Sequence, residues 1–239
     1  MPNWCYNNLR VEAEAAWTKD VKTHKKEQKK IEKELAKFKK ENIKDKKLTF
    51  EGSAPRPKEL DITSGSNVNN AIAFIKATLV KPAKDWTGID TIMEYQWTSK
   101  ECKFKKNDSV ATKRRKVIDY LRNSLSDDDQ KMGWQAIQNL KKYGFKDWYS
   151  WSIHNWGTKW DASDGSINSD HESELDVSFE TAWAPPIEWL EKASIKYKKL
   201  KFTLEYTEEG MSFEGKSFAK GGEVVNNSMQ IDYPDGFWD

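Results

Sequence analysis

The stretch ELDVSFETAW, residues 174–183, decides the fold class. Its residues alternate between apolar and polar, and a period of two is typical of a strand that buries one face. The apolar positions are Leu175, Val177 and Phe179. The stretch therefore predicts a strand in a sheet that has one face against the core.

The residues that follow predict one helix and two further strands. Pro185 and Pro186 start a helix that ends near Tyr197. A second strand is expected over residues 200–206 and, after a turn, a third over residues 211–218. The order strand, helix, strand, turn, strand is the C-terminal part of a split β-α-β sandwich.

The N-terminal stretch NWCYNNLRV, residues 3–11, supplies another strand, although its alternation is imperfect. With this strand added, an antiparallel sheet of four or more strands is the economical packing. Helices would cover one face of that sheet. We therefore expect an α+β fold.

Residues 14–42 predict one long helix, because they contain no Gly or Pro and carry a heptad seam. The seam consists of Trp17, Val21, His24, Gln28, Ile31, Leu35 and Phe38. Its polar middle disfavours a permanent coiled-coil dimer and favours an arm that packs at both ends.

The middle of the chain is predicted to be mainly helical, because its apolar residues recur at helical spacing. Helices are expected over residues 67–80, 111–124 and 126–143. Lys81 and Pro82 should end the first of them. Residues 85–107 fit an extended piece and a helix almost equally well.

These elements predict three parts in the chain. Residues 1–66 hold the first strand, the long helix and a Pro-rich loop, and they belong to the sheet domain. Residues 67–147 form a helical insertion. Residues 148–239 complete the sheet.

Charge is segregated along the chain, although 40 basic and 38 acidic residues leave a net charge of only +2. Residues 18–47 carry 13 Lys against six acidic residues. Residues 161–191 carry nine acidic residues and no Lys or Arg. Each block could steer a partner, or the two blocks could face each other.

Cysteine usage and hydropathy indicate a compartment. The chain has two cysteines, no CxxC pair, no charged-then-apolar leader and no long apolar run. These features predict a reduced, soluble, cytoplasmic protein without a membrane partner.

The densest aromatic segment is WYSWSIHNWGTKWDA, residues 148–162. Aromatic rings beside basic residues can stack nucleobases, but Trp is more often buried. The favoured interpretation is a core that joins the helical insertion to the sheet. The candidate binding residues in this segment are Trp151, His154, Asn155, Trp156, Lys159 and Trp160.

The residue patterns predict no catalytic residue, metal or cofactor. His154 and His171 have nearby carboxylates, but the spacing matches no known ligand frame. The stretch GMSFEG, residues 210–215, is one residue too long for a GxSxG nucleophile turn. Cys5 is more typical of a small buried residue than of a nucleophile.

Lys25, Lys26, Lys29 and Lys30 on the long helix are candidate phosphate contacts. The lysines of this helix surround the seam instead of forming one face, and almost no Arg accompanies them. A solvated or protein-docking arm is therefore favoured over nucleic-acid binding.

Four stretches resemble the YubB-type ferredoxin-like domain family, whose members occur on phages and conjugative plasmids. They are MPNWCYNNLRV at 1–11, HNWGTKWDA at 154–162, FETAWAPPIEWL at 179–190 and LEYTEEGMSFEG at 204–215. Asn155, Trp156, Gly157, Lys159 and Trp160 match the family signature. The resemblance implies a ferredoxin-like α+β fold and a mobile-element origin, and it implies no activity.

The leading hypothesis is a phage or plasmid accessory protein that acts without catalysis by binding a host protein. It would redirect a host process, oppose a defence system or be sensed by one. The alternative is a nucleic-acid-binding protein that uses the lysine-rich helix and aromatic residues of the sheet. A third hypothesis is an enzyme centred on His154, Lys159 and Asp161. The oligomeric state is not predicted.

Overall fold

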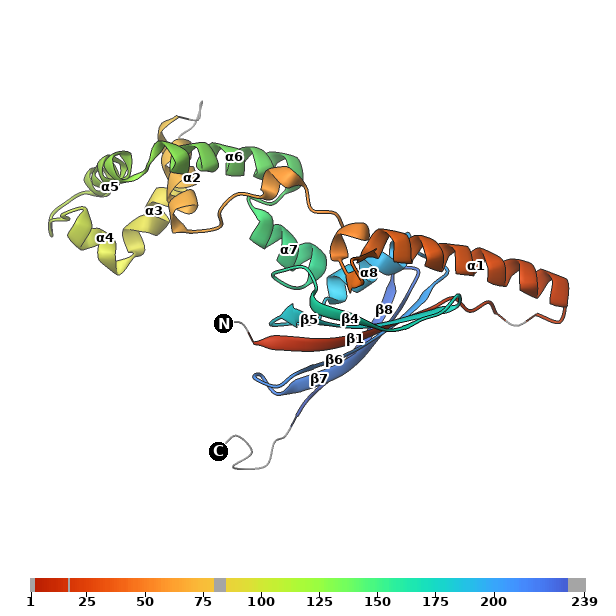
Figure 1. The fold of residues 1–239 in the computed structure, drawn as a ribbon. Helices are drawn as coiled ribbons and strands as arrows, with labels where there is room; N and C mark the ends of the chain where they lie inside the picture. The colour runs from red at the N-terminus through yellow and green to blue at the C-terminus, as the bar shows by residue number, and fades with distance from the viewer. Residues whose placement is uncertain (1–2, 17, 80–84, 232–239) are drawn as a thin grey trace. The chain divides into compact units, whose positions relative to one another are not determined.

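The computed structural model describes residues 3–16, 18–79 and 85–231. It divides the chain into two compact units (Figure 1). Unit 1 consists of Met1–Arg56 and Ser152–Asp239, and unit 2 consists of Pro57–Trp151. Among the described residues, no helix has the length and apolar character needed to cross a membrane.

Within its described residues, unit 1 contains a sheet of six antiparallel strands in the order β4-β5-β1-β6-β7-β8. The strands are β1 (Trp4–Glu12), β4 (Ser163–Asp170), β5 (Glu174–Ala182), β6 (Lys201–Glu208), β7 (Phe213–Lys220) and β8 (Glu223–Gln230). β1 is central, because it pairs with β5 on one side and with β6 on the other.

The topology is ferredoxin-like. Helix α1 (Val21–Asn42) connects β1 to the β4–β5 pair, and helix α8 (Ile187–Lys196) connects β5 to β6. The order β4-β5-β1-β6 is that of a split β-α-β fold, and β7 and β8 extend it beyond β6. The predicted α+β fold class and its antiparallel sheet are therefore confirmed.

Two strands of the six-stranded sheet were not expected from the sequence. β4 lies in the acidic block, for which a solvated loop was the commoner expectation, and Ile167 is its only large apolar residue. Every residue of β8 except Val224 is exposed, so this strand has no buried stripe to produce alternation. An edge strand can form through backbone pairing alone when its side chains face water.

Helices α1 and α8 lie together on one face of the sheet (Figure 1). The strand residues on that face are apolar; in β1 they include Cys5, Leu9 and Val11, none of which is exposed to solvent. Phe38 of α1 packs edge to face against Tyr197 and Phe202, with ring centroids 5.2 and 5.6 Å apart. These contacts bury the C-terminal half of the predicted heptad seam.

The long helix starts later than predicted, at Val21 instead of residue 14. Asp20 caps it by accepting hydrogen bonds from the backbone N–H groups of Lys22 and Thr23. Ahead of the cap, Gln28 Nε2 donates to the carbonyl oxygen of Ala13 at 2.6 Å, and its Oε1 accepts from Ala15 N at 2.9 Å. Gln28 therefore holds an extended connection. Trp17, the first predicted seam residue, lies outside the described residues.

The two chain segments of unit 1 meet at Phe50, in the short helix η1 (Phe50–Gly52) that follows the small hairpin of β2 (Ile43–Lys44) and β3 (Lys47–Leu48). Phe50 is fully buried, and its ring centroid lies 5.8 Å from that of Trp156 and 4.8 Å from that of Trp189.

Arg56 strengthens this junction, because it stacks over the ring of Trp156 at 5.3 Å and donates to Ser152 Oγ at 3.2 Å. We call the contacts of Phe50 and Arg56 with the segment 152–156 the clasp.

Unit 2 is helical. Its elements are η2 (Lys58–Leu60), α2 (Ser66–Thr78), α3 (Thr87–Glu94), α4 (Gln96–Glu101), α5 (Val110–Ser124) and α6 (Asp127–Tyr143), and α7 (Trp148–Trp156) contains its C-terminal boundary. Ser126 forms the capping box of α6, and Gly144 ends this helix with a positive φ of 77°. The predicted helices are thus present. Residues 85–107, for which an extended piece and a helix were almost equally expected, contain α3 and α4.

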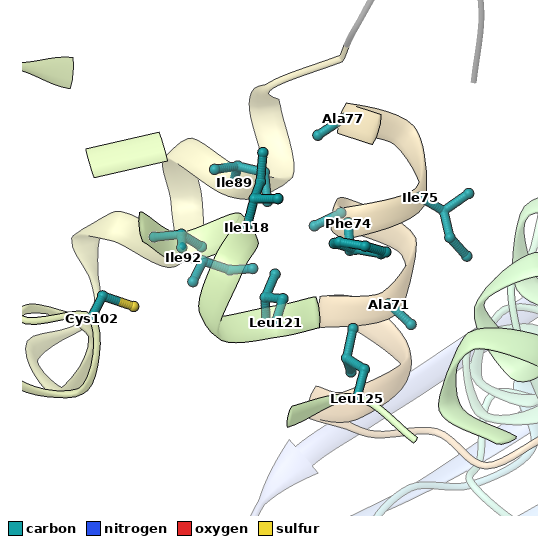
Figure 2. Close-up of a cluster of buried hydrophobic side chains, with 12 residues drawn as sticks. Ala71, Phe74, Ile75, Ala77, Ile89, Ile92, Cys102, Ile118, Leu121 and Leu125 are labelled. Carbon is teal, nitrogen blue, oxygen red and sulfur yellow. The ribbon is translucent and has the colours of Figure 1, made fainter. Parts of the chain in front are cut away.

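The core of unit 2 is aliphatic, with one central aromatic ring (Figure 2). Phe74 and Ala77 of α2 face Ile118 and Leu121 of α5, while Ile89 of α3 closes the side. The end of α2 expected at Lys81 and Pro82 lies outside the described residues, and α2 ends at Thr78.

The boundaries of unit 2 differ from the expected 67–147. Leu60 of η2 is fully buried, and Asn139 Nδ2 of α6 donates to the carbonyl oxygens of Glu59 and Lys146 at 2.8 and 3.0 Å. These bonds attach part of the Pro-rich loop to the helices, so the unit begins at Pro57.

The clasp predicts a large loss of stability for Phe50→Ala. Removing a buried Phe costs roughly 3–5 kcal/mol, whereas Phe218→Ala, at a side chain that is 46% exposed, should cost about 0.5 kcal/mol or less. Urea unfolding followed by tryptophan fluorescence measures both values. Equal losses in the two variants would show that Phe50 does not hold the two segments together.

Candidate functional site

The face of the sheet opposite α1 and α8 carries a groove with a volume of about 860 Å³. It results from strand alternation, because every second residue of β1, β5, β6 and β7 points away from the core. The side chains that line it include Tyr6, Asn8, Asp164, Ser178, Glu180, Glu205, Thr207, Glu214, Lys216, Asn227, Ser228 and Met229. We call this surface the open face.

One row of side chains crosses the open face through Tyr6. In β1, Tyr6 pairs with Glu180 of β5 and with Thr207 of β6, and Thr207 pairs with Glu214 of β7. The Tyr6 side chain is 47% exposed. Because neighbouring strands lie about 4.8 Å apart, Glu180 is next to the accessible ring, and Glu214 lies two strands away on the other side, at roughly 10 Å.

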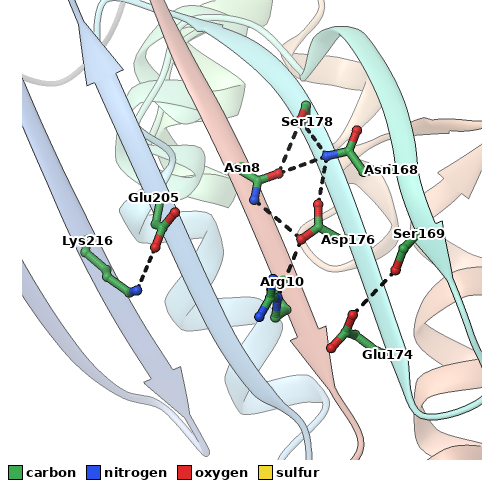
Figure 3. Close-up of polar contacts among 9 residues, drawn as sticks. All are labelled: Asn8, Arg10, Asn168, Ser169, Glu174, Asp176, Ser178, Glu205 and Lys216. Carbon is green, nitrogen blue, oxygen red and sulfur yellow. Dashed lines mark hydrogen bonds and ion pairs between the residues drawn. The ribbon is translucent and has the colours of Figure 1, made fainter.

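The next row crosses the face through Asn8. It pairs with Ser178 of β5 and Glu205 of β6, and Glu205 pairs with Lys216 of β7. Lys216 Nζ lies 2.6 Å from Glu205 Oε1 (Figure 3). The one lysine among the lining residues is therefore engaged by a carboxylate of the same surface.

A network around Asp176 fixes the edge of this row (Figure 3). Asn168 Nδ2 donates to Asp176 Oδ1 and to Ser178 Oγ, both at 2.7 Å. Arg10 Nε lies 3.5 Å from the other oxygen of Asp176, and Asn8 Nδ2 lies 3.4 Å from it. These bonds hold the side chains between β4, β5 and β1 in place before any ligand arrives.

The groove is acidic. Among the described residues that line it, Asp164, Glu180, Glu205 and Glu214 face the single cation of Lys216. No Lys or Arg of the described residues forms an ion pair with Asp164, Glu180 or Glu214. A partner that carries positive charge would therefore gain favourable electrostatic energy there.

The acidic block does not form one surface, because some of its carboxylates hold the fold together. Asp161 accepts hydrogen bonds from Thr49 Oγ1 and from Phe50 N, both at 2.6 Å, and burial raises its pKa. Asp170 pairs with Lys39 of α1 at 2.5 Å. The basic and acidic blocks thus meet at this point.

One of the two signature tryptophans, Trp156, lies in the core. Trp156 is 1% exposed, and its indole N–H donates to the carbonyl oxygen of Ala54 at 2.9 Å. Trp151 is also buried. Gly157 has a φ of +80° and packs against Glu188, so only glycine fits there.

The other candidate residues of this segment are more accessible. His154 is exposed, and Asn155 Oδ1 accepts from Lys192 Nζ at 2.9 Å. Lys159 Nζ lies 4.4 Å from the centroid of the Trp160 ring, which is 39% exposed. The segment thus divides into a buried half and a surface half.

The four candidate lysines of the long helix, Lys25, Lys26, Lys29 and Lys30, are exposed on the N-terminal half of α1. Lys30 pairs with Glu27 one turn earlier. Among the described residues, these four lysines form no ion pair or side-chain hydrogen bond with the accessible residues of the tryptophan segment.

Metal-ligating side chains are dispersed. Among the described residues, no three His, Cys, Asp or Glu side chains gather closely enough to hold a metal ion. Cys5 lies in β1 with no exposed surface, and burial raises its pKa to about 12.

Sequence reasoning missed the open face. Tyr6, Glu180, Glu205 and Glu214 come from four strands, and no spacing in the sequence connects them. The available signal was the polar half of each strand alternation, which marks the positions that point away from the core.

Residues 155–233 match a family model described as the ferredoxin-like domain in Api92-like protein. This range contains β4 to β8 and α8. A solved structure, a protein api92 from Yersinia pseudotuberculosis, is similar over 98% of this chain and 99% of its own, with 14% identity and a TM-score of 0.38. No curated protein has a sequence that matches this chain.

The burial of Cys5 predicts an unreactive thiol. At about pH 8 an ordinary thiol, with a pKa near 8.5, is partly ionised and reactive. The raised pKa keeps Cys5 protonated, so Ellman's reagent should not modify it in the native protein and should modify it after unfolding in guanidinium. A Cys102→Ser background isolates the signal. Rapid modification of the folded protein would show that Cys5 is an accessible nucleophile.

Proposed function

We propose that this protein acts without catalysis, by binding a host protein through the open face of its sheet. The observation that carries the proposal is the groove itself, in which an exposed tyrosine shares one row with two carboxylates that have no basic partner among the described residues. A surface of this kind suits recognition of a cationic segment.

The groove suggests what the partner presents. A Lys or Arg side chain placed over Tyr6 would gain a cation–π contact and the negative charge of Glu180 on the neighbouring strand, with Glu214 two strands away on the other side. Met229, which is 64% exposed at the rim, offers an adaptable apolar contact. An extended basic segment of a protein combines these properties.

The preorganised polar groups of the open face also support binding. Asp176 accepts bonds from two amides and lies near a guanidinium, and Glu205 pairs with Lys216. Side chains that already hold one another lose little further freedom when a partner docks. Such a surface can bind tightly without any chemical step.

The origin and setting belong to the same proposal. The four stretches that resemble YubB-type proteins support a phage or plasmid gene. The match of residues 155–233 to the Api92-like ferredoxin-like domain agrees with the fold that this resemblance implies. We place its action in the host cytoplasm. There it would redirect a host process, oppose a defence system or trigger one.

The nucleic-acid alternative meets an electrostatic obstacle at the open face, because phosphates would approach the carboxylates of Glu180 and Glu214. The buried ring of Trp156 offers no stacking surface. For this alternative, the exposed lysines of α1 remain the accessible surface.

The proposal predicts that reversing the charge of the groove abolishes capture of the partner. Tagged wild-type protein should retain a specific protein from a nuclease-treated host lysate. The double variant Glu180→Lys with Glu214→Lys should bind that purified protein at least about tenfold more weakly, roughly 1.4 kcal/mol.

A matched control makes this result specific. Glu172→Lys with Glu191→Lys changes the net charge equally at two exposed positions that do not line the groove and should bind normally. Equal binding by all three proteins would exclude the open face as the contact surface. Loss of all capture on nuclease treatment would favour the nucleic-acid alternative.

A further inference from the structure

Unit 2 carries a row of three aromatic rings, two of which are exposed. Tyr95 stacks on Trp97 with ring centroids 6.3 Å apart and an interplanar angle of 23°, and Trp97 lies 5.7 Å from Tyr120. Tyr95 is 50% exposed and Trp97 is 39% exposed. We call these three residues the aromatic row.

Local structure holds the row in position. Tyr95 occupies the single residue between α3 and α4, where its extended backbone caps both helices, and Trp97 lies in the first turn of α4. Tyr120 of α5 is partly buried and packs against the core of unit 2. The row therefore runs outward from the core on a rigid base.

A basic segment lies between Trp97 and Tyr120 in the sequence. Residues 100–116 contain eight Lys and Arg against Glu101 and Asp108, a net charge of +6. Lys116 pairs with Asp108, and Arg114 pairs with Asp90. Five cations of the segment remain exposed and form no ion pair with any described residue: Lys100, Lys103, Lys105, Lys106 and Arg115.

Helical spacing relates Lys100 and Lys116 to the rings. Lys100 is three residues beyond Trp97 in α4, which places both side chains on one side of that helix. Lys116 lies one helical turn before Tyr120, and its Nζ donates to the carbonyl oxygen of Lys103 at 2.8 Å. The side chain of Lys116 therefore links α5 to the backbone of Lys103.

We propose that the aromatic row of unit 2, with the basic segment 100–116, binds single-stranded nucleic acid. Bases stack on the exposed rings, and the lysines bind the phosphates. An unpaired strand fits better than a duplex, because stacking on a protein ring requires a free base face. The excess of positive charge selects a polyanion over a protein segment.

This site is independent of the open face and of the lysine-rich helix. It uses different residues in a different unit. A result that contradicts protein binding at the open face would therefore not contradict nucleic-acid binding at the aromatic row. A result against the aromatic row would likewise not contradict protein binding at the open face.

The test is the fluorescence anisotropy of labelled oligothymidylate and oligouridylate of about 15 nucleotides, a length within reach of a single-strand site. We expect both oligonucleotides to bind the full chain. Affinity should fall steeply between about 50 and 200 mM salt. Trp97→Ala should weaken binding about tenfold, whereas Trp134→Ala, at an equally exposed tryptophan of α6, should leave it unchanged.

Charge variants separate this site from the lysine-rich helix. The triple variant Lys100→Glu, Lys105→Glu, Lys106→Glu should abolish binding, whereas Lys25→Glu, Lys26→Glu, Lys29→Glu should retain it. Thermal unfolding confirms that each variant is folded. If the second triple variant loses binding, or if Trp97→Ala binds like wild type, the aromatic row is not the site. Absence of binding by the wild-type protein at low salt would also overturn the proposal.

Discussion

The contact between Phe50 and Trp156 is the constraint on which unit 1 depends. Unit 1 is built from a segment that precedes unit 2 in the sequence and contains α1, and from a segment that follows unit 2 and contains β4. These two segments must therefore meet. Phe50 fills the space between them, and its backbone N–H donates to Asp161, two residues before β4. Burying a carboxylate is costly unless its oxygens are satisfied. Here three donors satisfy them, so the same contact that closes the core also positions the edge strand of the open face.

The sequence predicted the elements that bury one clean stripe and missed those that do not. β5 alternates without interruption, and α6 has a serine cap at one end and Gly144 at the other. β4 and β8 offer no such stripe, because their side chains face water or neighbouring polar groups. The start of the long helix was placed too early, because the heptad spacing continued back through residues that Gln28 holds in an extended form. The spacing of apolar residues indicates which side of a helix or strand is buried. Local polar contacts, such as those of Gln28, decide where the helix or strand begins.

Binding surfaces were harder to predict than the fold, for a physical reason. Tyr6 and Glu214 are more than two hundred residues apart in the sequence. The pairing of β1 with β6 and of β6 with β7 places them in one row of the open face. The tryptophan-rich segment attracted attention because its rings are adjacent in sequence, yet Trp156 belongs to the core. The aromatic row of unit 2 drew none, because Tyr120 comes from a different helix than Trp97. A binding surface whose residues come from several helices or strands has no characteristic spacing in the sequence.

The central position of β1 imposes an order on biosynthesis. Trp4 pairs with Ala182, and Cys5 pairs with Glu208, so the first strand to leave the ribosome acquires its neighbours only when most of the chain has been made. Unit 2 has contacts that are local in sequence and a core of its own, so it folds while β1 is still unpaired. During that interval the apolar side of β1 is open to other nascent chains. A nascent chain that has not yet reached β5 therefore leaves both edges of β1 without a partner strand.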